Sequence, residues 1–172
     1  MIPPNELDSF RGDLAGTLDF YQGKIAIDIG HTSLRKFADA LDTKRRIYRA
    51  ALSDDNAKAA SKAQQNAATQ LISHIGALAG LLRELALLVE SYSKPKNPGE
   101  LPASRNDLTA LREQFAEVTT SIENLIESID QVKRVLLRRS RGALNSDPKS
   151  GDNRSYRPEP IIAITDYRRE AR

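Results

Sequence analysis

The two histidines are the residues of this sequence best suited to bind a metal ion or to transfer a proton near neutral pH. His31 follows Asp28 at a spacing of three, which is the spacing of a carboxylate–histidine ligand pair on a helix. A di-iron bundle needs two such pairs and two further glutamates, and the pair occurs once here. We therefore interpret His31 as a surface residue at a helix start and His74 as a hydrogen-bonded core or boundary residue. No metal site and no cofactor are predicted.

Other catalytic arrangements are missing from the sequence. It contains no cysteine, no phosphate-binding glycine-rich loop and no Gly-x-Ser-x-Gly motif. Arg83 and Glu84 are adjacent, and adjacent residues point about 100° apart on a helix, so they do not form an acid–base pair. We expect no enzymatic activity and identify no small-molecule substrate; a small enzyme or toxin with an unrecognised site is an alternative. Acidic residues expected to solvate the outer face of the last helix are Glu113, Glu117, Glu123, Glu127 and Asp130.

Basic residues are concentrated at the C-terminal end of the chain. Residues 133–172 contain eleven Lys/Arg and five Asp/Glu, whereas the whole chain has a formal net charge of +3. Cations near a helix C-terminus complement its dipole, so part of this cluster has a structural explanation. The functional interpretation is contact with phosphates or with an acidic partner. The residues concerned are Lys133, Arg134, Arg138, Arg139, Arg141, Arg154, Tyr156, Arg157, Tyr167, Arg168 and Arg169.

One apolar seam predicts the architecture that must position these residues. Its nine members follow a three-four spacing and are Leu108, Leu111, Phe115, Val118, Ile122, Leu125, Ile129, Val132 and Leu136. In a heptad register the flanking positions are Arg112, Thr119, Ile126 and Lys133 on one side and Gln114, Ser121, Ser128 and Val135 on the other. These are mostly small, neutral or apolar rather than paired Glu and Lys. The seam therefore favours a multi-helix bundle over a dimeric coiled coil.

Apolar periodicity and capping residues predict four helices. They extend from an N-cap at Asn5 to about Asp28, from Thr32 or Ser33 to about Leu52, from about Asp55 to Tyr92, and from a capping box at Ser104–Asp107 to about Arg139. The two long helices form an antiparallel hairpin across a Pro-rich loop, and the first two pack across it. Gly12 and Gly16 share a face where a neighbouring helix could approach closely. The predicted core residues are Leu78, Leu82, Leu85, Ile122, Leu125 and Ile129.

The segment 71–89 is apolar on nearly every side and contains Gly76-x-x-x-Gly80. Arg83 and Glu84 argue against a membrane span, because an Arg or a carboxylate at the bilayer centre costs about 2.5–3.5 kcal/mol. We expect no membrane span and expect this helix to be buried in the bundle.

These patterns predict an all-α protein in which residues 1–142 form a helical bundle and residues 143–172 a flexible, mostly disordered basic tail. The tail carries a short apolar segment at 160–165, whose Ile161, Ile162 and Ile164 are candidates for docking onto a partner. No basic and then apolar signal sequence opens the chain, so we expect a cytoplasmic protein. The predicted role is a non-catalytic scaffold, adaptor or accessory subunit that binds a protein partner or its own copies. The alternative is a nucleic-acid-binding accessory protein that uses the basic end.

Overall fold

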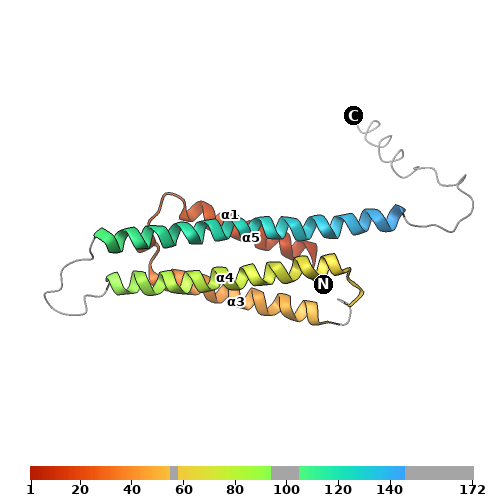
Figure 1. Cartoon of the computed structure of the whole chain (residues 1–172), viewed down its shortest axis with the longest axis horizontal. Coiled ribbons are helices and arrows are strands. Elements are labelled where there is room, and N and C mark those ends of the chain that lie inside the picture. The colour runs from red at the N-terminus through yellow and green to blue at the C-terminus, as the bar shows by residue number, and fades with distance from the viewer. Residues whose placement is uncertain (55–57, 94–104, 146–172) are drawn as a thin grey trace, which may run out of the picture. The chain divides into compact units, whose positions relative to one another are not determined.

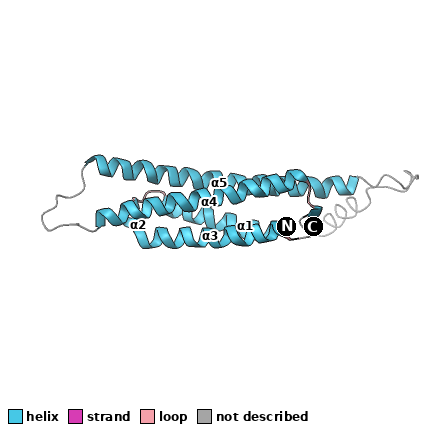
Figure 2. Cartoon of the chain, turned by 60° about the horizontal axis from the view of Figure 1, so that its bottom comes forward, coloured by secondary structure: helices cyan, strands magenta, loops and turns pink. Residues whose placement is uncertain are grey.

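The computed structural model describes residues 1–54, 58–93 and 105–145, with the side chains of 105–107 and 139–145 left out. The described residues contain no strand, and their α-helices confirm the predicted all-α class (Figures 1 and 2). The chain divides into two compact units, Met1–Leu137 and Arg138–Arg172. The helices are α1 (Pro4–Tyr21), α2 (Ala26–Ile29), α3 (His31–Ser53), α4 (Lys62–Ser93) and α5 (Arg105–Asn145).

Contacts between helices of the first unit show that neighbouring long helices are antiparallel. On α1 and α5, Asp8 pairs with Lys133 and the rings of Tyr21 and Phe115 lie 5.8 Å apart, so residue numbers rise on one helix as they fall on the other. The same relation joins the other neighbours. Their contacts are Glu6–Lys44 and Tyr21–Phe37 for α1 and α3, Arg35–Glu90 and Asp42–Arg83 for α3 and α4, and His74–Ser128 and Glu84–Gln114 for α4 and α5.

The first unit is therefore an up-down-up-down bundle with the cyclic helix order α1, α3, α4, α5 (Figures 1 and 2). The predicted antiparallel hairpin of α4 and α5 is confirmed by their contacts. The expectation that the first two helices pack across this hairpin is wrong, because α1 lies along α5 and α3 lies along α4. Packing lengthwise lets each helix bury its apolar face over several turns.

The core fills the space between the four long helices. The predicted apolar seam of α5 faces this core except near its start, where 39% of Leu108 is exposed. At the centre of the bundle, side chains of α4 and α5 are completely removed from solvent, as predicted from their shared register. They are Leu78, Leu82, Leu85, Ile122, Leu125 and Ile129.

The first two helices differ from the prediction at their ends. The first ends at Tyr21 rather than near Asp28, and a turn with Gly23 at φ +77° separates it from the short α2. Its N-cap is Pro3 and not Asn5; Pro4 takes the first helical position, where a missing N–H costs nothing. Gly30, at φ +83°, then caps α3 in place of Thr32 or Ser33. Glycine at the two turns lets the chain adopt a conformation that other residues rarely take.

The two long helices also differ from their predicted bounds. Instead of beginning near Asp55, α4 begins at Lys62 after a capping box. In it, the Ser61 backbone N–H donates to Gln64 Oε1 at 3.0 Å and the Gln64 N–H donates to Ser61 Oγ at 3.3 Å. At the other end of the hairpin, α5 begins at Arg105 as expected and continues past Arg139 to Asn145. The predicted cap at Ser104 lies outside the described residues.

Glycines allow a close approach at a different place from the one predicted. No atom lies within 4 Å of a Cβ built on Gly12 or Gly16, so the predicted helix contact at that face is wrong. On α4, by contrast, a Cβ on Gly76 would lie 2.8 Å from Cζ of Arg45 on α3. The Arg45 guanidinium thus lies directly against the α4 backbone.

Among the described helices, α4 is the one whose length and composition would allow it to cross a membrane, with a mean hydropathy of 1.6 over an 18-residue window. In that window, 44% of the residues are buried inside the structure. The central helix of a bundle meets the same criterion, so this finding is weak evidence for a span. The absence of a membrane span stays a prediction.

Candidate interaction site at the seam of α4 and α5

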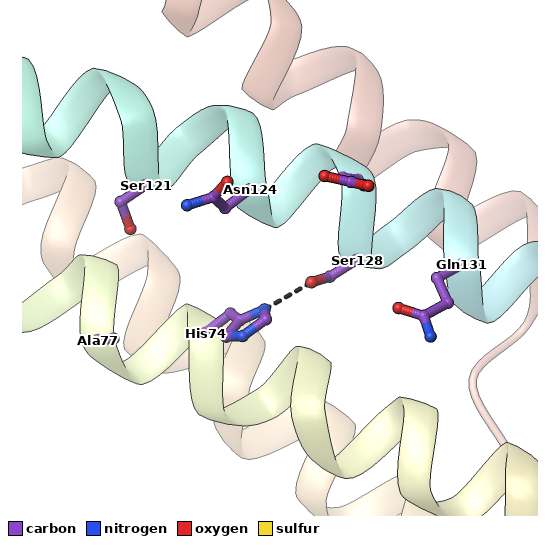
Figure 3. Close-up of a pocket in the computed structure, with 7 residues that line it drawn as sticks. His74, Ala77, Ser121, Asn124, Ser128 and Gln131 are labelled. Atoms are coloured by element: carbon purple, nitrogen blue, oxygen red, sulfur yellow. Dashed lines mark hydrogen bonds between the residues drawn. The ribbon is translucent and has the colours of Figure 1, made fainter.

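An open groove follows the seam between α4 and α5. One part of it, about 390 Å³, contains the polar side chains drawn in Figure 3. A second part adjoins the first, because Ser121 and Asn124 line both. The other residues that line the first part are His74, Ala77, Glu127, Ser128 and Gln131, and those of the second are Leu81, Glu113, Ala116, Glu117 and Thr120.

Helical spacing and small side chains explain why the groove forms here. On α4, His74, Ala77 and Leu81 follow one another at three and four positions, so they share a face. The facing residues of α5 follow the same spacing, as Ser121, Asn124 and Ser128 do. Alanine, serine and threonine fill little of the space between two helix backbones, which leaves a hollow where larger residues would close the seam.

His74 and Ser128 form the central polar contact of the groove. Figure 3 shows the two side chains pointing toward each other from α4 and α5, with His74 Nδ1 2.5 Å from Ser128 Oγ. Ser128 is 8% exposed, whereas His74 is open to solvent on the groove side. This contact confirms that His74 is hydrogen-bonded, whereas its expected place in the core or at its boundary is wrong, because the residue is exposed. A serine–histidine nucleophile also needs a group that orients the imidazole, and Ser128 is the one hydrogen-bond partner of His74 among the described side chains.

The other three seams of the bundle are closed by ion pairs. Arg11 Nε lies 2.8 Å from Asp130 on α5, and this hydrogen bond, together with the charge of Asp130, raises the pKa of Arg11. Asp130 therefore pairs across a seam and is not a purely solvated residue as predicted. The remaining cross-helix pairs are Lys133–Asp8, Lys44–Glu6, Arg35–Glu90 and Arg83 with Asp39 and Asp42.

The seam of α4 and α5 has no ion pair between its described side chains. Glu84 accepts a long hydrogen bond, 3.4 Å, from Gln114, and His74 contacts Ser128. The charged residues that line the groove are all carboxylates, Glu113, Glu117 and Glu127, and all three are exposed. No described cation lies within ion-pair distance of them. The groove is therefore acidic.

The structure describes only part of the basic region predicted from the sequence. Lys133 is paired with Asp8, whereas Arg134 and Arg138 are exposed near the end of α5. The side chains of Arg139 and Arg141 lie outside the described residues. The same holds for all the tail residues predicted as contacts: Arg154, Tyr156, Arg157, Ile161, Ile162, Ile164, Tyr167, Arg168 and Arg169.

The histidine nearer the N-terminus lies apart from the groove. His31 is the first residue of α3 and is partly exposed, as expected of a residue at a helix start. Within the described part of the chain, no group of three or more His, Cys, Asp or Glu residues is placed to hold a metal ion.

The residues of α5 that line the groove have a pattern that is visible in the sequence. Gln114, Ser121 and Ser128 recur every seven residues beside the apolar seam of α5, and from the sequence alone their small or neutral character indicates a wider buried stripe. In the structure Ser121 and Ser128 line the groove, and Gln114 contacts α4 beside it.

Comparisons of the chain with protein-family models, curated proteins and solved structures find no match.

Proposed function

We propose that this protein is a non-catalytic helical scaffold or adaptor that binds a protein chain in the groove between α4 and α5. The observation that carries the proposal is the difference between the seams. Three seams pair their carboxylates with cations of the neighbouring helix, whereas Glu113, Glu117 and Glu127 line the fourth with no described cationic partner. Charges left unpaired along a groove can select a partner of opposite charge and guide its approach.

The shape of the groove suits a helix. Its α5 side extends from Glu113 to Gln131, which at about 1.5 Å per residue is roughly 27 Å, or about five helical turns. A helix laid in a groove between two others presents residues at three-four spacing to both. Leu81, Ala77 and Ala116 offer apolar contacts to such a helix, and the carboxylates offer ion pairs at the rim.

Site-specific photo-crosslinking in the native cell tests this function. A photoreactive amino acid is placed at Ala77 or at Thr120 in the groove, and in a control variant at Ala40, which is exposed on α3. We expect ultraviolet irradiation to join a protein chain to the two groove variants and not to the Ala40 variant. Mass spectrometry of the adduct identifies that chain. Equal adducts at all three positions, or none in the groove, would contradict the proposed function.

A second candidate function is binding of nucleic acid by the basic end of α5. What favours it is that Arg134 and Arg138 are exposed and form no ion pair with a described side chain, in contrast to Lys133. Arginines of this kind contact phosphates without reading base sequence. Sedimentation velocity before and after nuclease treatment separates this candidate from protein binding, because association through phosphate contacts requires that the nucleic acid is present.

A further inference from the structure

We infer that the groove between α4 and α5 binds the basic end of α5 from a second copy of this chain. This inference rests on the proposed function and names its partner. The groove and the basic end are different surfaces, so each copy offers both a binding site and the segment that fills such a site. Two copies can pair reciprocally about a two-fold axis, or further copies can join in rings or open chains.

The end of α5 has the character of a basic amphipathic helix. Arg134 and Arg138 are four positions apart in one helix, which places them on the same face. Leu137 lies beside them with 61% of its side chain exposed, a high value for a leucine in this bundle. The segment thus presents an apolar residue flanked by two cations.

The groove complements this segment in both charge and spacing. Glu113 and Glu117 are also four positions apart on α5, so the Cβ atoms of the two glutamates have the same spacing as those of the two arginines. An arginine can donate two parallel hydrogen bonds to one carboxylate, which favours such pairs over a diffuse attraction. Leu81 lies in the same part of the groove, where an exposed leucine from the second copy would lose contact with water.

Another exposed basic pair supplies a matched control. Arg46 and Arg49 lie three positions apart on α3, and both are exposed beside Ile47, which is 52% exposed. A variant with Arg46→Glu and Arg49→Glu changes the net charge by the same amount as one with Arg134→Glu and Arg138→Glu. Only the second variant alters the segment that we assign to the groove.

Sedimentation velocity of the purified, nuclease-treated full chain over a range of concentrations tests the inference. We expect the unaltered chain to associate. The dissociation constant of the Arg134→Glu, Arg138→Glu variant should be higher by a factor of about ten or more, and a factor of ten corresponds to about 1.4 kcal/mol. A groove variant with Glu113→Lys and Glu117→Lys should behave in the same way. The α3 control variant should associate like the unaltered chain.

Mixing the two defective variants gives the decisive result. The groove variant keeps its basic end, and the variant of the basic end keeps its acidic groove, so these two surfaces can still bind each other. The two altered surfaces, a basic groove and an acidic end, also have opposite charges. We therefore expect the mixture to recover the association that each variant lacks alone. Recovery requires that both variants are folded, so it cannot arise from a loss of structure.

Several outcomes would overturn the inference. They are a chain that is monomeric at every concentration, a mixture that does not recover association, and a loss of association in the α3 control alone. Association that disappears on nuclease treatment would assign the basic end to nucleic acid. If the groove crosslinks to a different protein in cells while the purified chain is monomeric, the proposed function holds and the second copy is the wrong partner.

Discussion

At the scale of single residues, the least satisfied polar groups of the described bundle lie on α3. The Tyr48 hydroxyl and Arg45 Nε are buried and have no hydrogen-bond partner. The Tyr48 ring is completely buried and meets Phe10 edge to face, with ring centroids 5.9 Å apart. Burial raises the pKa of Tyr48, and it raises that of Tyr21 to about 12. The buried Tyr48 ring therefore stabilises the fold, whereas its unsatisfied hydroxyl destabilises it.

We therefore expect Tyr48→Phe to leave the free energy of unfolding unchanged or to raise it by up to about 1 kcal/mol, because the ring stays and an unsatisfied hydroxyl is removed. The gain should grow above pH 10. An unfolded tyrosine ionises near its ordinary pKa while the folded one stays neutral, so the unaltered protein loses stability as the pH rises through that range. Urea denaturation at neutral and alkaline pH measures both effects. A loss of more than about 1 kcal/mol at neutral pH would mean that the hydroxyl has a partner.

At the scale of elements, backbone conformation decides where helices end and cross-helix pairs decide which helices are neighbours. The ion pairs of Arg11, Arg35 and Lys44 each join different helices, and all are partly exposed. Exposed pairs contribute little to the free energy of unfolding, because water screens their charges. Their main effect is on specificity, since a different order or register of helices would set like charges against each other.

Two glycines make a matched test of the backbone argument. Gly30 has φ +83° and ψ 148°, a conformation strongly unfavourable for residues with a Cβ, so Gly30→Ala should lower the free energy of unfolding by about 1–3 kcal/mol. Gly16 lies inside α1 with open space around it, so Gly16→Ala should raise that free energy by about 0.5–1 kcal/mol. Chemical denaturation of the two variants compares them directly. If both substitutions change the free energy of unfolding in the same direction, the backbone conformation described for at least one of the two glycines is wrong.

At the scale of the whole molecule, the bundle is held together by its apolar core. Leu125 lies at the centre of that core and is completely buried, whereas 60% of Leu87 is exposed on α4. We expect Leu125→Ala to lower the free energy of unfolding by about 2–5 kcal/mol, because it removes buried methyl groups and leaves a cavity. Leu87→Ala should change it by less than about 0.5 kcal/mol. Thermal unfolding followed by circular dichroism checks the pair, and equal effects would contradict the arrangement of the core.

Apolar spacing along the chain is enough to predict the helical class, the core face of α5 and the antiparallel hairpin. These follow from periodicity: apolar residues at three-four spacing produce one buried face wherever a helix forms, as for Ile122, Leu125 and Ile129. The sequence also contains a signal for the start of α4, since Ser61 and Gln64 have the spacing of a capping box, but the Asp- and Asn-rich segment before it is a competing signal. The end of α1 could not be predicted, because residues 24–29 have enough apolar character to continue a helix that Gly23 ends.

The features on which the proposed function depends come from the packing of the helices against one another. Periodicity assigns Ser121 and Ser128 to the edge of a seam, and it cannot say whether that edge is filled or left open, because this depends on the side chains of α4 opposite. The pairing of the carboxylates also depends on the neighbouring helix. Asp130 pairs with Arg11, while Glu117 has no described cation as a partner, and the sequence of α5 alone does not distinguish these two residues. A charge is satisfied or left free by the neighbouring helix, and the packing of the bundle fixes which helix that is.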